Sequence, residues 1–191
     1  MRIIAGEFRS RRLESIPGNA TRPTADRVRE ALFNILQTRI AGASFVDAYA
    51  GTGAVGIEAL SRGAAHAWFL ERDRRALDAI RKNLASLGVE RRATILAGKV
   101  LVTLDRCPAG IVFLDPPYDQ ADEYTGALGS LGERPPALTI AQHSVHLKLK
   151  DVYGGLRRTR MVRHGDNALS FYCGASGSHH YNREGPAPGN L

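Results

Sequence analysis

A glycine-rich segment between an apolar run and a helical pattern places the strongest constraint on the fold of this 191-residue chain. Gly51-Thr52-Gly53-Ala54-Val55-Gly56 follows the strand-like run 45–48 and precedes the helical pattern 55–62. Glycines permit a sharp backbone turn and the close approach of a ligand, and the first amides of the next helix are free to bind it. The segment predicts a strand–turn–helix unit that holds a nucleotide-like ligand.

Apolar runs alternate with helical patterns along the rest of the chain, which is typical of βαβ units around a mostly parallel sheet. In the clearest helix, apolar residues recur at helical spacing from Val28 to Leu36, with Thr24 as the expected N-cap. A second helical pattern, 74–87, ends at Gly88. Strands are expected at 45–48, 67–71, 94–97, 111–114 and 138–142, with a closing hairpin at 156–164 and 168–173.

One compact domain accounts for this length. A composition of 43% hydrophobic and 24% charged residues is ordinary for a globular protein. A chain of 191 residues buries about 70% of its unfolded surface. We expect a basic N-terminal arm at 1–22, a main domain at 23–173, and a flexible tail at 174–191, which has few apolar residues to bury.

The formal net charge of +7 favours a polyanionic partner, because arginines that contact phosphates release condensed counterions. A basic surface kept only for solubility is the alternative. Basic residues gather in two places: Arg2, Arg9, Arg11 and Arg12 in the arm, and Arg157, Arg158, Arg160 and Arg163 in the hairpin. Arg22, Arg27 and Arg29 are expected nearer the candidate active site. Such contacts position a nucleic acid without reading its sequence.

The two cysteines, Cys107 and Cys173, predict neither a disulfide framework nor a metal site, since neither has Cys or His neighbours at ligand spacing. No apolar run reaches the roughly 18 residues of a membrane span, and the N-terminus has no apolar signal segment. We therefore expect a cytoplasmic protein with no membrane partner and no metal.

The apolar run Ile111–Leu114 ends in Asp115-Pro116-Pro117-Tyr118, which suits chemistry on an exocyclic base amine. Such an amine reacts better when fixed acceptors hold its hydrogens, and the Asp115 carboxylate and Pro116 carbonyl are candidate acceptors. Prolines have a fixed φ and no amide hydrogen, so the turn is stiff, and Tyr118 offers a face for base stacking. An ordinary proline-rich turn after a strand is the alternative.

Two acids accompany the glycine segment. Glu71 lies 20 positions beyond Gly51, where an acid that binds ribose hydroxyls is expected. Asp47, just before the glycines, suits the sulfonium and ammonium of S-adenosylmethionine better than a pyrophosphate, although it can also cap the turn. The predicted cofactor-binding residues are Asp47, Ala50, Gly51, Thr52, Gly53, Glu71 and Arg72.

Together these motifs resemble those of the RsmD-type ribosomal RNA methyltransferases. The resemblance covers about residues 1–173 and rests on four segments: 1–6, 22–30 with its Arg-Pro-Thr sequence, 47–60, and 115–118. It implies a Rossmann-like class I fold with a mostly parallel seven-stranded sheet and a monomer. The implied reaction is S-adenosylmethionine-dependent methylation of a guanine N2 amine in 16S ribosomal RNA, free or in an assembling small subunit. The predicted RNA contacts are Arg2, Arg9, Arg11, Arg12, Arg22, Thr24, Arg27 and Arg29.

Three alternatives stay open. An adenine-N6 or DNA amino-methyltransferase would use the same pocket, and only the resemblance argues for guanine. A nicotinamide-dependent oxidoreductase shares the glycine segment but has no use for the Asp-Pro-Pro-Tyr turn. A non-catalytic RNA-binding module would need the basic residues but not Asp47 or Glu71. Where relatives often place an acid or amide against adenine, this chain has Ala97-Gly98-Lys99.

Overall fold

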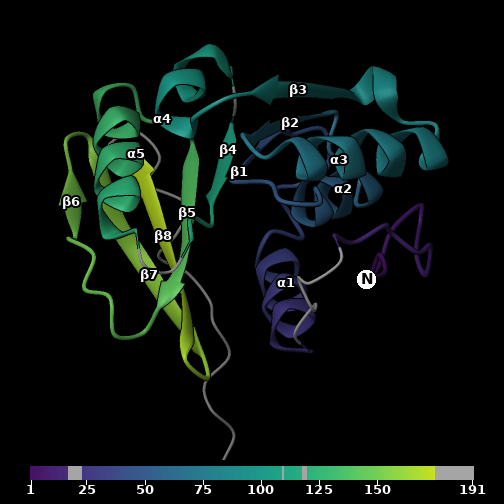
Figure 1. Ribbon diagram of the computed structural model, residues 1–191. Helices are drawn as coiled ribbons and strands as arrows, with labels where there is room; N and C mark the ends of the chain where they lie inside the picture. Colours follow the sequence, from purple (N-terminus) through teal and green to yellow (C-terminus); the bar gives the residue numbers. More distant parts are fainter. Residues whose placement is uncertain (17–22, 109, 118–119, 175–191) are drawn as a thin grey trace, which may run out of the picture.

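The computed structural model describes residues 1–16, 23–108, 110–117 and 120–174, and one sheet organises them. Its strand order is β3-β2-β1-β4-β5-β8-β7-β6 (Figure 1). The parallel strands are β1 (Ser44–Ala48), β2 (His66–Glu71), β3 (Ala93–Ala97), β4 (Ile111–Leu114) and β5 (Leu138–Ser144). The antiparallel strands are β6 (Val152–Tyr153), β7 (Leu156–His164) and β8 (Asn167–Gly174).

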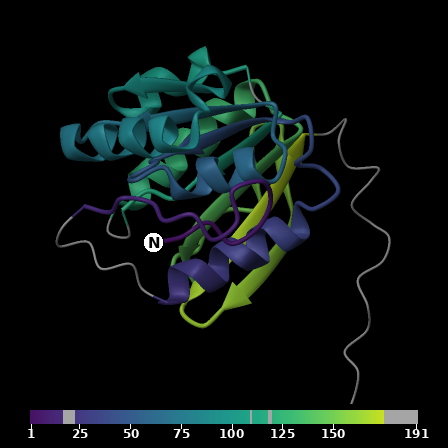
Figure 2. The ribbon, with the colours of Figure 1, turned by 90° about the vertical axis from the view of Figure 1, so that its right-hand side faces the viewer.

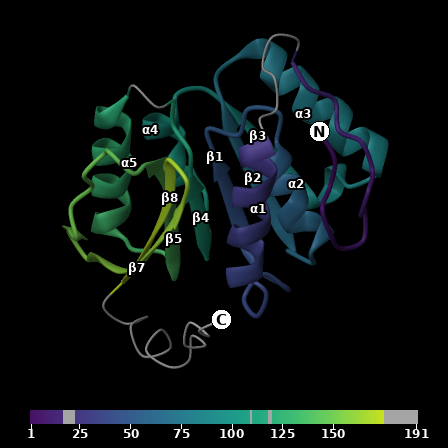
Figure 3. The same ribbon diagram turned by 90° about the horizontal axis from the view of Figure 1, so that it is seen from below.

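Helices cover both faces of the sheet (Figure 3). One face carries α1 (Pro23–Ile35), α2 (Ala54–Ser61) and α3 (Arg74–Leu87), and the other carries α4 (Val100–Thr103) and α5 (Ala121–Glu133). The 3-10 turns η1 (Glu90–Arg92) and η2 (Leu104–Arg106) lead into β3 and β4. Because successive strand residues face opposite sides, Phe45 packs toward α1 while Val46 packs toward α5.

The observed fold confirms the predicted α/β architecture. Every predicted strand is present within two residues of its expected ends, and α3 ends at Gly88, which has the left-handed backbone of a C-cap. The short strand β6 brings the sheet to eight strands rather than the expected seven. The predicted N-cap is wrong: Pro23 begins α1, so Thr24 lies in its first turn, and proline suits that position because its φ is helical and its missing N–H is not needed.

Helix α5 was not predicted from the sequence. It contains three glycines, and glycine is among the poorest helix formers. One of them has a packing reason: a Cβ on Gly132 would lie 2.2 Å from the Tyr153 carbonyl oxygen. The close approach of α5 to β6 therefore overrides local helix propensity. The predicted tail lies outside the described residues from position 175 onward.

The described part of the N-terminal arm packs along α2 and α3 (Figure 2). Its anchor is Glu58 of α2, whose side chain is fully buried. Glu58 Oε2 accepts the Ile4 amide at 2.8 Å, and Oε1 accepts the Ala5 amide at 3.0 Å and Arg62 Nε at 2.7 Å. Arg29 Nε lies 3.8 Å from the same carboxylate. One buried acid thus joins the arm, α1 and α2.

Replacement of this anchor should destabilise the protein strongly. Glu58→Ala would leave two arm amides and the neighbouring guanidinium groups buried without their acceptor, which costs about 3–5 kcal/mol of unfolding free energy. Urea denaturation measures the loss. Glu30→Ala, an exposed acid on α1, is the matched control and should change stability by less than about 0.5 kcal/mol. Equal stabilities for the two variants would contradict the anchoring role.

Candidate active site

The glycine turn and the Asp-Pro-Pro turn lie side by side at the carboxyl edge of the sheet. β1 and β4 are paired in parallel with Ala48 opposite Leu114, so each turn begins at the next register position. The Asp115 amide donates to the Ala48 carbonyl at 3.4 Å. Neighbouring strands are about 4.8 Å apart. The two turns flank the point where the strand order reverses, which is where open α/β sheets bind their ligands.

Glycine is required at two positions of the first turn for different structural reasons. Gly53 has φ of 78° at the N-cap of α2, a left-handed conformation that glycine adopts without strain. A Cβ on Gly56 would lie 2.4 Å from the Phe69 ring, so only glycine lets α2 approach β2 this closely. Asp47, buried below the turn, accepts the Gly56 amide at 2.8 Å. Its capping of the turn, one of the two roles considered for Asp47, is therefore present in the structure.

Glu71 fastens the other end of the glycine turn. Its Oε2 accepts the Gly51 amide at 2.8 Å, while Oε1 accepts the amides of Arg72 and Asp73 at 2.7 and 2.8 Å. The Ala50 amide, next to Gly51, donates to the carbonyl of Leu70. Carboxylate oxygens have about four acceptor positions in all, so these three amides leave capacity for a ribose hydroxyl.

The amine-side turn is held from α5. Asp115 is half-buried, Pro116 is buried and Pro117 is exposed, whereas Tyr118 lies outside the described residues. The Tyr124 hydroxyl donates to the Gln142 carbonyl at 2.7 Å and lies 3.5 Å from the Pro116 carbonyl. This buried tyrosine therefore lies beside the carbonyl that the sequence assigned to amine binding, while its hydrogen is donated to Gln142.

Acids are concentrated at this edge of the sheet. Burial raises the pKa of Asp115 from 3.8 to about 7. Burial also raises the pKa of Asp47 to about 8, and the charges of Asp115 and Glu71 add to that rise, while the Gly56 amide and Arg29 oppose it. A site with these properties favours a cationic ligand, since positive charge would stabilise the ionised carboxylates.

Sequence reasoning missed Asn83, a buried side chain of α3. Its Nδ2 donates to the Thr52 carbonyl at 3.1 Å and to the Glu14 carbonyl at 3.3 Å, and its Oδ1 accepts the Glu14 amide at 2.7 Å. Asn83 therefore ties the arm to the glycine turn. The available signal was an amide residue three positions after Ile80, on the apolar face of a helix.

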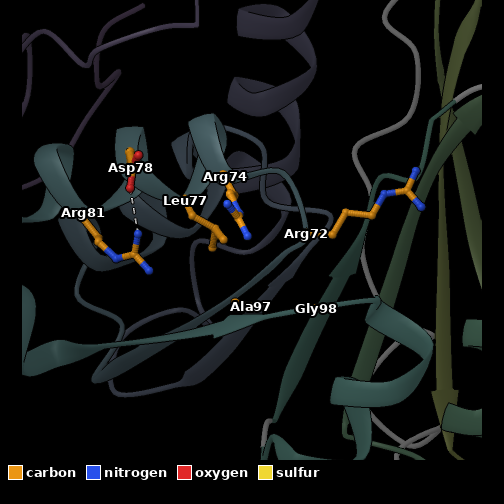
Figure 4. A pocket seen from close by; sticks show the side chains of 7 residues that line it. All are labelled: Arg72, Arg74, Leu77, Asp78, Arg81, Ala97 and Gly98. Carbon is orange, nitrogen blue, oxygen red and sulfur yellow. Dashed lines mark hydrogen bonds and ion pairs between the residues drawn. The ribbon is translucent and has the colours of Figure 1, made fainter.

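An open pocket of about 510 Å³ lies beside α3 (Figure 4). It lies between the start of α3 and the ends of β2 and β3, and Figure 4 shows Arg72 extending away from the other arginines. Arg81 is paired with Asp78 at 2.8 Å. The residues that line the pocket are Arg72, Arg74, Leu77, Asp78, Arg81, Ala97 and Gly98. The pocket therefore includes the segment where an acid facing adenine is absent.

The predicted RNA contacts divide into exposed and buried residues. The arm arginines Arg2, Arg9, Arg11 and Arg12 are exposed, as is Arg27 on α1. Arg29 differs from the expectation: it is 5% exposed, and its guanidinium donates to the Arg2 carbonyl and to Asp26. It is an internal anchor of the arm, because these contacts and its burial leave it little access to a ligand. Arg22 lies outside the described residues.

Within the described ranges, no group of three or more His, Cys, Asp or Glu residues is arranged to hold a metal ion. None of the helices in this part of the chain is long and apolar enough to span a bilayer.

Comparisons with known proteins agree with this geometry. Residues 1–173 match the family described as Conserved hypothetical protein 95. The putative rRNA methyltransferase YlbH of Bacillus subtilis is 32% identical over 90% of this chain and 98% of its own length. The ribosomal RNA small subunit methyltransferase D of Escherichia coli is 42% identical, over 62% of this chain and 60% of its own length. A solved structure, the putative methyltransferase yhhF of E. coli, superposes with a TM-score of 0.81 at 33% identity, covering 91% of this chain and 97% of that one.

The raised carboxylate pKa values predict a pH dependence of stability. An acid with a raised pKa binds its proton more tightly in the folded state, so the free energy of unfolding falls as pH rises from about 4 toward 7. Asp115→Asn removes one such group, so its stability relative to the wild type should increase between about pH 5 and about pH 7.5. Urea denaturation at both pH values measures this change. A difference that is independent of pH would contradict the raised pKa of Asp115.

Proposed function

The chain belongs to the Conserved hypothetical protein 95 family, and on that premise we propose that it methylates a guanine N2 amine in small-subunit ribosomal RNA. One observation carries the proposal: the register of β1 and β4 sets the glycine turn beside the Asp-Pro-Pro turn. A donor on one turn and an amine on the other would therefore be neighbours. The names of the B. subtilis and E. coli relatives, both ribosomal RNA methyltransferases, support ribosomal RNA as the substrate.

The residues of the glycine turn fit S-adenosylmethionine. This chain also shares the class I fold of methyltransferases that use this cofactor. When bound, this cofactor supplies an electrophilic methyl group on a sulfonium. Glu71 would accept the ribose hydroxyls, and Asp47, near the turn, would favour the positive charges. The proposed cofactor residues remain Asp47, Ala50, Gly51, Thr52, Gly53, Glu71 and Arg72. The pocket at Ala97 and Gly98 is the proposed adenine side.

Asp115 and the Pro116 carbonyl would hold the amine hydrogens and direct the nitrogen toward the methyl group. As the amine gains the methyl group, positive charge would develop on its nitrogen, so a fixed carboxylate beside it would stabilise the transition state more than the ground state. The surplus N–H proton would leave to Asp115 or to water. The stiff Pro116-Pro117 turn keeps these acceptors in place without reorganisation. Tyr118 is proposed to stack on the base.

The exposed arginines of the arm and of α1 would bind the RNA backbone. Free ribosomal RNA and an assembling small subunit both satisfy this chemistry. The expectations of a monomer, of a cytoplasmic location and of a domain division at residues 22 and 173 stay part of the proposal. RNA contacts by Arg22 and Thr24 rest on the Arg-Pro-Thr resemblance alone.

Adenine-N6 methylation is the second candidate, since Asp115 and Pro116 would hold either amine. Nucleoside analysis of the product separates the two. Nicotinamide oxidoreduction predicts NADH binding, which fluorescence measures. A non-catalytic RNA-binding module predicts RNA binding with no affinity for S-adenosylmethionine by calorimetry.

Asp115→Ala should lower methyl transfer by about 10³-fold, because the charge that develops on nitrogen loses its carboxylate. The substrate is ribosomal RNA from a strain lacking this protein, with labelled S-adenosylmethionine and mass analysis of the nucleosides. We expect N2-methylguanosine as the wild-type product. Calorimetry should give a cofactor affinity for the variant within about threefold of the wild type.

Asp122→Asn is the matched control, since it removes a carboxylate from an exposed position in the first turn of α5. It should keep wild-type activity. Undiminished turnover by Asp115→Ala would contradict the mechanism. N6-methyladenosine as the product would show that the methylated base is adenine and not guanine.

The arm should contribute phosphate contacts. Arg9→Ala combined with Arg12→Ala removes two exposed cations, so the slope of log affinity against log salt should fall in magnitude by about 1.4 to 1.8. Filter binding with ribosomal RNA at several salt concentrations measures the slope. The control pair, Arg106→Ala with Arg134→Ala, removes two exposed cations before β4 and β5, on the face of the sheet opposite to the arm. Equal slopes for the two pairs would argue against a role for the arm.

A further inference from the structure

Tyr49 has an unusual backbone for its residue type. It directly follows β1 and has φ of 66°, a left-handed conformation that only one other described non-glycine residue, Ser10, shares. A side chain at positive φ is strained, and such strain persists only where surrounding contacts fix the residue. The position matters because Tyr49 leads directly into Ala50 and Gly51 of the glycine turn.

A hydrogen bond across the site holds this residue. The Tyr49 hydroxyl donates to Glu123 Oε2 at 2.8 Å. Its ring is half-buried and packs against the core beneath α5. Burial and the Glu123 carboxylate both raise the pKa of the Tyr49 phenol above its usual value, so the hydroxyl keeps its proton and acts as a donor. Proton abstraction by Tyr49 is therefore not its role.

The two residues belong to opposite sides of the proposed reaction. Tyr49 begins the cofactor side, while Glu123 lies in the first turn of α5, directly after the amine-binding turn. Because Ala48 pairs with Leu114, Tyr49 and Asp115 occupy equivalent positions on adjacent strands. The strand pairing joins the two turns at their base, and the Tyr49–Glu123 bond joins them a second time. The two bonds therefore tie both ends of the amine-binding segment to residues 48 and 49, directly before the glycine turn.

We propose that Tyr49 and Glu123 are a positioning pair that fixes the glycine turn against the amine-binding turn, so that donor and amine meet at reacting distance. The inference rests on the proposed methyl transfer. Reacting groups must approach to about 3–3.5 Å, and a displacement of about 1 Å can cost 100-fold in rate. The pair touches neither reacting atom and acts only through the two turns.

Single-turnover methyl transfer to ribosomal RNA, with saturating S-adenosylmethionine, tests the pair. Tyr49→Phe and Glu123→Ala should each lower the rate about 10-fold, and the double variant should be no slower than either single one, since both remove the same bond. Cofactor affinity by calorimetry should stay within about threefold. Glu123→Gln, whose amide oxygen still accepts the hydroxyl, should restore most of the rate. Asp122→Ala is the control and should leave the rate unchanged.

A second measurement does not depend on activity. The same double-mutant cycle in urea denaturation, without ligand, should be non-additive because the two side chains are in contact. Additive unfolding effects would overturn the bond itself. Wild-type transfer rates in Tyr49→Phe, with coupled unfolding, would overturn the positioning role. A wild-type protein that transfers no methyl group would defeat the proposed function and with it the positioning role, while the unfolding cycle would still report on the bond.

Discussion

The parallel pairing of β1 with β4 is the constraint on which the site depends. It is a backbone interaction, set by register, and it places two turns of different chemistry at adjacent positions. A shift of β4 by one residue against β1 would turn Phe113 away from the α1 face and would displace the two turns from adjacent positions. The buried apolar residues on both faces of the sheet therefore fix the geometry of the site as well as the stability of the fold.

Electrostatics at this edge of the sheet work against the ligand-free protein. Asp47 and Asp115 ionise less readily than free carboxyl groups because burial removes their water. A ligand that carries a sulfonium and an ammonium would restore a favourable environment for the Asp47 carboxylate. The proposed cofactor therefore supplies a positive charge that Asp47 lacks, and its binding would be linked to proton release by Asp47.

The sequence predicted the sheet and the two turns because local signals encode them. The glycines from Gly51 to Gly56 and the prolines after Asp115 restrict the backbone within a few residues. It did not predict α5, whose glycines serve packing against β6, nor the burial of Arg29, which depends on Glu58 and on the arm. The hydrogen bond from Tyr49 to Glu123 joins residues 74 positions apart, so no local sequence pattern predicts it.

A crystal structure with S-adenosylhomocysteine would test the central claim most directly. We predict the ligand on the glycine turn, with its sulfur facing the Asp115 carboxylate across roughly 6 Å, the width of one amine held between methyl group and acceptor. A sulfur that points away from Asp115, or a ligand confined to the pocket between Arg74 and Gly98, would contradict the account.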